Sequence, residues 1–440
     1  MKWSSRPGHD QGAVFFVFLF TVFLILCSTK GSCFSSSGEV LHLTGFLRTR
    51  SYQLFSSDQS TQQEKTSGDY FILDLLSRFK LETKHESFRS LAVFDVEQDL
   101  RQQSDSDANL NACEFYGQWR GRHLELTAGK QIIPWGVADG FILTDLINPR
   151  DCRQFIIPRL DRKTSNDFLI GVPGCRLKFM SGPFLFESVW ITRFVPGKYD
   201  EEGIWAFAPP SSGGENPEAE TPEPNFGNSE AAARLMVNGP RSQLALCAFY
   251  GWDDDASYRF DQKTMQLRPF YSRLRAFGMH FEASVFSSIW RFEAVRRAGD
   301  DRNGDDPGIA NDSVRALIGW ERTLWGTTTV TLQYYTDRML KYEEYRKTAS
   351  RNRPLSEKVA TTYSLGINSR LFHEYVQPQL ISYYNPQARE IFVNGEIQYL
   401  LVDHAIVQAG VNLFDTRDQD EGLWKFRRND HWYLNFYYFF

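Results

Sequence analysis

Charged, amide and indole side chains are concentrated in one stretch of the sequence, from Gly129 to Asp151. Those that could act on a passing ion or solute are Lys130, Trp135, Asp139, Asp145, Asn148, Arg150 and Asp151. Acidic and basic groups close together along the chain can set the electrostatic field inside a water-filled pore. We therefore treat these seven residues as candidates for a pore constriction.

The stretch must be held by a loop, because it leaves a strand-like segment at Ile132 and turns at Pro134 and Gly136. Asn148 followed by Pro149 is typical of a helix start, with Asn as the cap and Pro at the first helical position. A helix through about Ile157 would place the side chains at 152, 155 and 156 on one apolar face.

The charged side chains of this loop need water, while its apolar residues need cover, and the wall of a wide hydrated pore provides both. We therefore predict that residues 133–167 form a constriction loop folded into a barrel. The alternative is a helix that caps the outer rim.

A second set of charges lies at positions that a strand pattern turns toward the inside of a barrel. They are Arg48, Arg78, Glu282, Arg291, Glu293, Arg315, Arg370 and Glu396. Facing charges of both signs could create a field across a pore. Alternatively, they pair with one another and only solvate the inner wall.

The elements that would position these residues are strands with one apolar and one mixed face. In the last ten residues, Trp432, Leu434, Phe436, Tyr438 and Phe440 alternate with Tyr433, Asn435, Tyr437 and Phe439. A period of two with aromatic residues on one side is typical of a strand between lipid and lumen. Eighteen such segments recur along the chain, and a soluble sandwich is the alternative for any one of them.

The connections between these segments carry an independent pattern. Brief turns such as Ser181-Gly182-Pro183 alternate with long polar loops such as 195–230, and Asn385-Pro386-Gln387 is a short exception. Short periplasmic turns and long outer loops indicate an outer-membrane barrel, and an even strand count would put both termini in the periplasm. We predict an all-β fold, a single transmembrane antiparallel β-barrel of 16–18 strands.

The N-terminus resembles a secretory signal peptide. Lys2 and Arg6 precede an apolar run over 13–27, and small residues follow it. We assign 1–32 to the signal peptide and 33–440 to the barrel, which predicts the outer membrane of a Gram-negative bacterium. No later apolar run has the 18 or so residues that a spanning helix needs.

No cofactor and no metal site are expected. Cys113, Cys152, Cys175 and Cys247 lack paired metal spacing and read as free or singly paired thiols. The acidic run 300–306 looks like a calcium loop but lacks its closing Glu, so a plain acidic turn is favoured. No His stands in a recognisable nucleophile motif, so the sequence predicts no enzyme and no catalytic residue.

The Gly129–Asp151 stretch also resembles a known pattern. Gly-Lys-Gln followed by Trp-Gly, Asp-Gly and Asp-x-x-Asn-Pro-x-Asp is similar to the hallmark of a porin-like family of Gram-negative outer-membrane β-barrels, a domain of unknown function. The resemblance covers about residues 120–205, although Thr192 stands where that family has Pro. It implies a channel without specifying its solute.

Taken together, the sequence predicts a porin-like channel that passes a small solute or an exported compound. A barrel enzyme of the lipase or protease type, and a structural or export barrel serving a periplasmic machine, are the alternatives. The expected partners are outer-membrane lipid, lipopolysaccharide and the barrel-insertion machinery, which would bind the C-terminal strand. Nucleic acid is not expected, and a homo-oligomer is left open.

Overall fold

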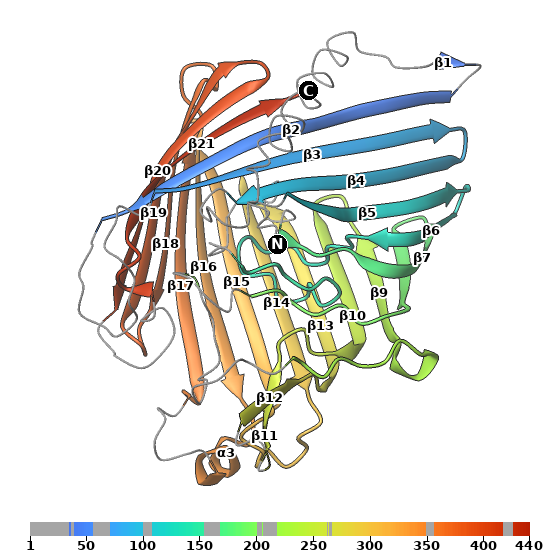
Figure 1. Ribbon diagram of the computed structural model, residues 1–440, viewed down its shortest axis with the longest axis vertical. Coiled ribbons are helices and arrows are strands. Elements are labelled where there is room, and N and C mark those ends of the chain that lie inside the picture. The colour runs from blue at the N-terminus through green and yellow to red at the C-terminus, as the bar shows by residue number, and fades with distance from the viewer. Residues whose placement is uncertain are drawn as a thin grey trace, which may run out of the picture.

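Backbone hydrogen bonds between the first and last long strands close the sheet into a barrel in the computed structural model (Figure 1). It describes residues 35–36, 39–55, 71–99, 108–153, 168–199, 205, 218–261, 263, 266–348, 356–416 and 426–440. At the seam, Gly45 and Phe440 exchange backbone hydrogen bonds of 2.8 and 3.0 Å. The predicted signal peptide lies outside the described residues.

Every neighbouring pair in the barrel is antiparallel. Its eighteen strands are β2 (Glu39–Leu54), β3 (Phe71–His85), β4 (Phe88–Asp99), β5 (Asn109–Arg120), β6 (Leu124–Gln131), β7 (Val172–Ser181), β8 (Phe184–Ile191), β9 (Glu230–Asn238), β10 (Ser242–Trp252), β13 (Arg273–Val285), β14 (Ser288–Ala298), β15 (Ser313–Leu324), β16 (Thr328–Met339), β17 (Val359–Ser369), β18 (Val376–Asn385), β19 (Glu390–Val402), β20 (Ala405–Thr416) and β21 (His431–Phe439). The predicted fold class is confirmed, at the upper end of the predicted strand count.

Side-chain exposure alternates along the strands, with apolar residues on the outside and polar residues on the inside. In β14, Trp290 is 43% exposed while Glu293 is fully buried. In β21, Leu434 is 45% exposed while Asn435 is 3% exposed. A barrel with an apolar exterior and a polar interior is the arrangement that a lipid bilayer requires.

The connections alternate in length as the sequence predicts. Tight turns such as Gly182-Pro183 join one strand of each pair to the next, and several contain residues with positive φ, including Phe286 and Trp325 at 49° and 51°. The long loops carry the hairpin β11 (Ser257–Asp261) and β12 (Gln266–Phe270), η2 (Phe226–Asn228) and α3 (Tyr342–Thr348). A two-residue strand, β1 (Ser35–Ser36), pairs with the start of β2. Figure 1 places α3 and β11–β12 at the same end of the barrel.

None of the helices in the described ranges is long and apolar enough to cross a membrane.

The outward row of β21 follows the predicted alternation for most of its length. Trp432, Leu434 and Phe436 are exposed, while Tyr438 and Phe440 are half-buried. The Phe440 ring lies over Gly45, where an added Cβ would approach it to 2.7 Å. Glycine at this position therefore lets the terminal ring pack across the seam.

The alternation of turns and loops predicts which end of the barrel faces the outside of the cell. An epitope tag inserted at Asp305, in a long loop, should be labelled on intact cells, whereas a tag at Gly182, in a tight turn, should be labelled only after permeabilisation. Both variants should remain heat-modifiable on gels, which controls for folding. Labelling of the Gly182 tag on intact cells would show the opposite orientation.

Candidate functional site

The segment that follows β6 lies inside the barrel. Its apolar side chains, Ile133, Trp135, Leu143, Leu146 and Ile147, are at most 9% exposed. They share one core cluster with inward-facing residues of the wall strands, namely Val172, Val189, Ala232, Cys247, Phe249, Leu274, Ala276, Val295 and Leu317. We refer to residues 133–148 as the plug.

A single wall residue, Glu293 of β14, organises the centre of the plug. One carboxylate oxygen accepts hydrogen bonds from the backbone N–H groups of Val137 and Ala138, at 2.6 and 2.8 Å. The other accepts from the N–H groups of Leu143 and Thr144, at 2.8 and 2.9 Å, and from the Thr144 hydroxyl at 3.1 Å. Glu293 is fully buried, so these five hydrogen bonds replace the water that its charge has lost.

Glycine is needed where the plug turns around this carboxylate. Gly136 has a φ of 96°, and a Cβ there would lie 2.2 Å from the Ile142 side chain and 2.8 Å from Oε1 of Glu293. The Trp-Gly pair of the sequence pattern thus has a local steric basis.

Two further groups of wall charges fix the plug. Asp139 forms a 2.8 Å ion pair with Arg291, which also pairs with Glu282 at 2.8 Å and Glu321 at 2.9 Å. The Arg234 guanidinium lies 5.0 Å from the centre of the Trp135 ring. The Glu187 carboxylate forms an ion pair of 2.5 Å with that guanidinium and orients it. The same carboxylate also forms an ion pair with Arg176.

The plug extends across the lumen to the opposite wall. Phe141 stacks on Tyr335 of β16 at 5.2 Å and meets Tyr383 of β18 edge-on at 5.1 Å. The chain enters the lumen from β6, which is eight strands away from β16 around an eighteen-stranded ring.

A second buried cluster beyond Phe141 includes a residue that sequence reasoning missed. Trp205, from the β8–β9 connection, is 4% exposed and packs with Phe414, Phe426 and His431. Its indole N–H donates to the Tyr52 hydroxyl at 3.3 Å. The sequence predicts a polar loop over 195–230, and the signal for Trp205 is its place in the short apolar run 204–208.

The predicted helix at Pro149 does not form within the described residues 149–153, so that prediction is wrong there. The Asn148 side chain does not cap a helix. It accepts from the Ile133 N–H at 2.7 Å and donates to the Ile170 carbonyl at 2.9 Å. Phe155 and Ile156, which were expected on the apolar face of the predicted helix, lie outside the described residues.

In place of a helix, the chain forms an extended three-segment layer. The backbone of Arg150 forms an antiparallel β-bridge with that of Leu169, and the backbone of Asp151 forms a parallel β-bridge with that of Lys198. The Asp151 and Lys198 N–H groups donate to the carbonyls of Phe168 and Arg150, at 2.8 and 2.9 Å. We call residues 149–153, 168–171 and 197–198 the platform.

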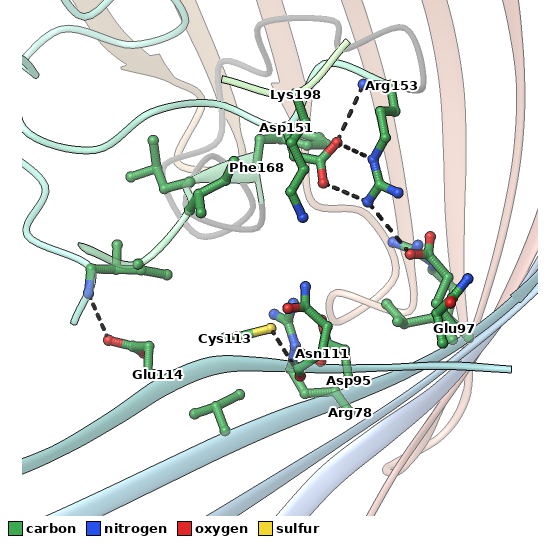
Figure 2. A pocket seen from close by; sticks show the side chains of 18 of the residues that line it. Arg78, Asp95, Glu97, Asn111, Cys113, Glu114, Asp151, Arg153, Phe168 and Lys198 are labelled. Carbon is green, nitrogen blue, oxygen red and sulfur yellow. Dashed lines mark hydrogen bonds and ion pairs between the residues drawn. The ribbon is translucent and has the colours of Figure 1, made fainter. Parts of the chain in front are cut away.

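A cleft of about 290 Å³ separates the platform from the inner face of β2–β6 (Figure 2). We call it the charged cleft. Its ionisable lining is Arg48, Arg50, Asp74, Arg78, Asp95, Glu97, Cys113, Glu114, Lys130, Asp151, Arg153 and Lys198. Both signs of charge therefore face a space that is open to water.

Most of the arginines that line the charged cleft are paired. Arg50 lies 2.5 Å from Asp74, and Arg78 makes two bonds to Asp95, at 2.7 and 2.8 Å. Arg153 bonds Asp151 at 2.6 Å and lies 3.7 Å from Glu97 of β4. Figure 2 shows this last contact reaching from the platform to the barrel wall.

The structure distributes the predicted constriction residues over two environments. Trp135, Asp139 and Asn148 are buried in or beneath the plug, whereas Lys130 and Asp151 line the charged cleft.

The other two constriction candidates, Asp145 and Arg150, are neither fully buried in the plug nor part of the lining of the charged cleft. Asp145 is half-buried, and its carboxyl lies 3.5 Å from the Trp135 N–H. Burial raises the pKa of this loop carboxyl to about 7. Arg150 has an exposed side chain, and its carbonyl accepts from Lys198.

The predicted lumen charges do not form one ring. Arg48 and Arg78 line the charged cleft, while Glu282, Arg291 and Glu293 contact the plug or its ion-pair group.

The remaining lumen charges lie on other parts of the wall. Arg315 pairs with Asp337 at 2.8 Å, and Glu396 accepts from the Tyr433 hydroxyl at 2.5 Å. Arg370 lies just beyond β17, where its side chain is 58% exposed and pairs with Glu374 of the turn, so it does not join the wall.

The remaining sequence features have local roles. The four cysteines named above are free thiols. In the acidic turn, the Asp301 carboxylate accepts from the backbone of Asn303, Gly304 and Asp306. Over the ranges that the structure describes, no group of three His, Cys, Asp or Glu residues is arranged to hold a metal ion.

No protein-family profile and no curated protein sequence matches the chain. Its fold is similar to that of OccAB1 from Acinetobacter baumannii, with a TM-score of 0.54 and 8% identity over 91% of this chain and 96% of that one. It is also similar to OccK11 (OpdR) from Pseudomonas aeruginosa, with a TM-score of 0.52 and 9% identity over 91% and 95%. Both are outer-membrane porin-like barrels. At these identities the similarity establishes the fold alone.

Replacing Glu293 should loosen the plug while leaving the barrel intact. In Glu293→Gln, an amide N–H₂ would face two backbone N–H donors, and leaving buried donors unsatisfied costs about 2–3 kcal/mol. Amide hydrogen exchange over 137–144 should therefore become roughly 100-fold faster, because local opening follows this free energy.

Glu396→Gln is the matched control, since it neutralises another buried wall carboxylate, one that accepts from the Tyr433 hydroxyl of β21. Exchange over 137–144 should be unchanged in that variant. Unchanged exchange in Glu293→Gln as well would mean that apolar packing and the contacts of Arg291 and Arg234 hold the plug without Glu293.

Proposed function

We propose that this protein is a porin-like outer-membrane channel and that a small solute crosses it through the charged cleft. The observation that carries the proposal is a closed eighteen-stranded barrel with an apolar exterior, whose lumen is crossed by a plug that leaves a water-open cleft along β2–β6. A polar lumen inside an apolar belt is what an aqueous path through lipid requires.

The two halves of the lumen differ in how a solute would meet them. On the β18–β20 side, Phe141, Trp205 and Phe414 belong to a packed aromatic cluster that presents no charged group to a solute. On the β2–β6 side, the lining is ionised and open. The charged cleft is therefore the favoured path, and the platform, with Asp151 and Arg153, is its constriction.

The motif that resembles the porin-like family supports membership in that family. Gly136 turns the chain around Glu293, Asp139 pairs with Arg291, and Asn148 ties the end of the plug to its start. Each of these motif residues has a defined contact in the plug of this chain, which supports the proposal that the motif residues act together to build the plug.

The enzyme alternative meets a physical obstacle at a site in the described part of the chain that resembles a catalytic set. The Thr144 hydroxyl lies 3.1 Å from both His280 Nδ1 and Glu293 Oε2. All three residues are fully buried, so no substrate reaches the hydroxyl. We assign this group to holding the plug, which favours a channel.

Assembly in the membrane is proposed to depend on the outward row of β21. Trp432, Leu434 and Phe436 are exposed at the closing strand, where the insertion machinery could bind them before the seam with β2 forms. Outer-membrane lipid and lipopolysaccharide would then contact the same row.

Removing the crossing part of the plug should widen the path. We expect the purified protein to conduct ions in planar bilayers, and replacement of residues 141–148 by a short Gly-Ser linker to raise single-channel conductance several-fold, because the lumen of a barrel this size is wide when empty. A matched control shortens α3 outside the barrel and should leave conductance unchanged. A folded protein that does not conduct would refute the channel, and unchanged conductance in the linker variant would place the path elsewhere.

A further inference from the structure

Lys130 is held at the edge of the charged cleft by its backbone surroundings. Its ammonium group donates to the Ala112 carbonyl at 2.6 Å. Its aliphatic stem lies against Gly171, where an added Cβ would be 3.3 Å from Lys130 Cγ and 2.4 Å from the Cys113 carbonyl oxygen. A glycine before β7 thus leaves room for the lysine to reach the cleft.

The charge of Lys130 is not balanced by a neighbouring carboxylate. Lys198 of the platform lines the same cleft and is also cationic. Among the residues that the structure describes, neither Lys130 nor Lys198 forms an ion pair. This separates them from Arg50, Arg78 and Arg153, which are all paired with carboxylates at 2.5–2.8 Å.

Three acidic residues of the cleft form short ion pairs with arginine. Asp74 and Asp95 are bound by Arg50 and Arg78, and the Asp151 carboxylate is bound by Arg153. Glu97 lies 3.7 Å from the same Arg153, and Glu114 accepts from the Ile132 N–H at 2.9 Å. The lining has six basic and five acidic residues, so it carries one excess positive charge. A close pair of opposite charges has a weak field at a distance, which leaves the unpaired lysines as the basic groups best placed to meet a solute.

We propose that Lys130 and Lys198 form an anion-binding subsite in the charged cleft, and that the transported solute carries a carboxylate or phosphate group. Two ammonium groups that face the same hydrated space repel each other, and an oxyanion between them removes that repulsion and accepts their N–H donors. The inference rests on the proposed channel function and adds the chemical class of its solute.

Cys113 lines the same cleft and follows Ala112, whose carbonyl binds the Lys130 ammonium, so its thiol reports the local potential without requiring ion conduction. The test compares its modification by two thiosulfonate reagents of similar size, one with a sulfonate and one with a trimethylammonium group. Peptide mass spectrometry identifies the modified cysteine, and the reactivity of the thiol itself cancels in the ratio of rates.

The sulfonate reagent should react faster in the native protein. In the double variant Lys130→Gln/Lys198→Gln, the ratio of the two rates should fall at least about tenfold, because two nearby charges are lost. Lys347→Gln is the control, since this exposed lysine of α3 lies outside the barrel lining. An equal ratio in the native protein and the double variant would overturn the subsite.

Bilayer recordings then separate the two anion chemistries. Inorganic phosphate and acetate are added in turn at constant ionic strength, and each should reduce chloride current in the native protein if its class is bound, with the reduction lost in the double variant. Block by phosphate alone assigns a phosphate-bearing solute, and block by acetate alone assigns a carboxylate. Conduction with no block by either anion would refute the subsite while leaving the channel proposal intact, whereas absence of conduction would refute the channel itself.

Discussion

The interior of this barrel depends on one buried carboxylate, that of Glu293. A charged group without water is costly, and here its cost is offset by four backbone N–H groups and one hydroxyl of the plug. The dependence is mutual, because those same N–H groups would be unsatisfied inside the lumen without the carboxylate. A polar contact of this kind defines one position for the segment, whereas apolar packing alone would permit sliding.

This fixed position divides the lumen unequally. The plug and Trp205 cover the inner faces of many strands with apolar and aromatic contacts, so the ionised side chains on that side are used to hold protein. Along β2–β6 no such cover is described, and the ionised side chains face the platform across open space. Ionised side chains of the barrel wall thus hold the plug on one side of the lumen, whereas on the other side similar side chains face water.

The sequence predicted the barrel well because its pattern is local. Alternation within each strand and the lengths of turns and loops depend on neighbouring residues, and even the inward direction of Glu293 and Arg291 follows from period two. Their partners do not follow from it, because Val137 and Asp139 lie more than a hundred residues away. The helix expected after Asn148 does not form for a different reason, because Ile133 and Ile170, 15 and 22 positions away, occupy the side-chain groups of Asn148 that would have capped it. Arg370 shows the limit of the pattern itself, because β17 ends one residue earlier and the inward row stops there.

The hydrogen bonds of Glu293 also bear on the order in which the molecule is built. The plug residues precede their acceptor by 149 to 156 positions, and Phe141 rests on a tyrosine of β18 that comes later still. Contacts of such long range form late in folding, after the strands that carry them are in place. We therefore expect the barrel to assemble around an interior that is still vacant, through a precursor that is more open than the mature protein.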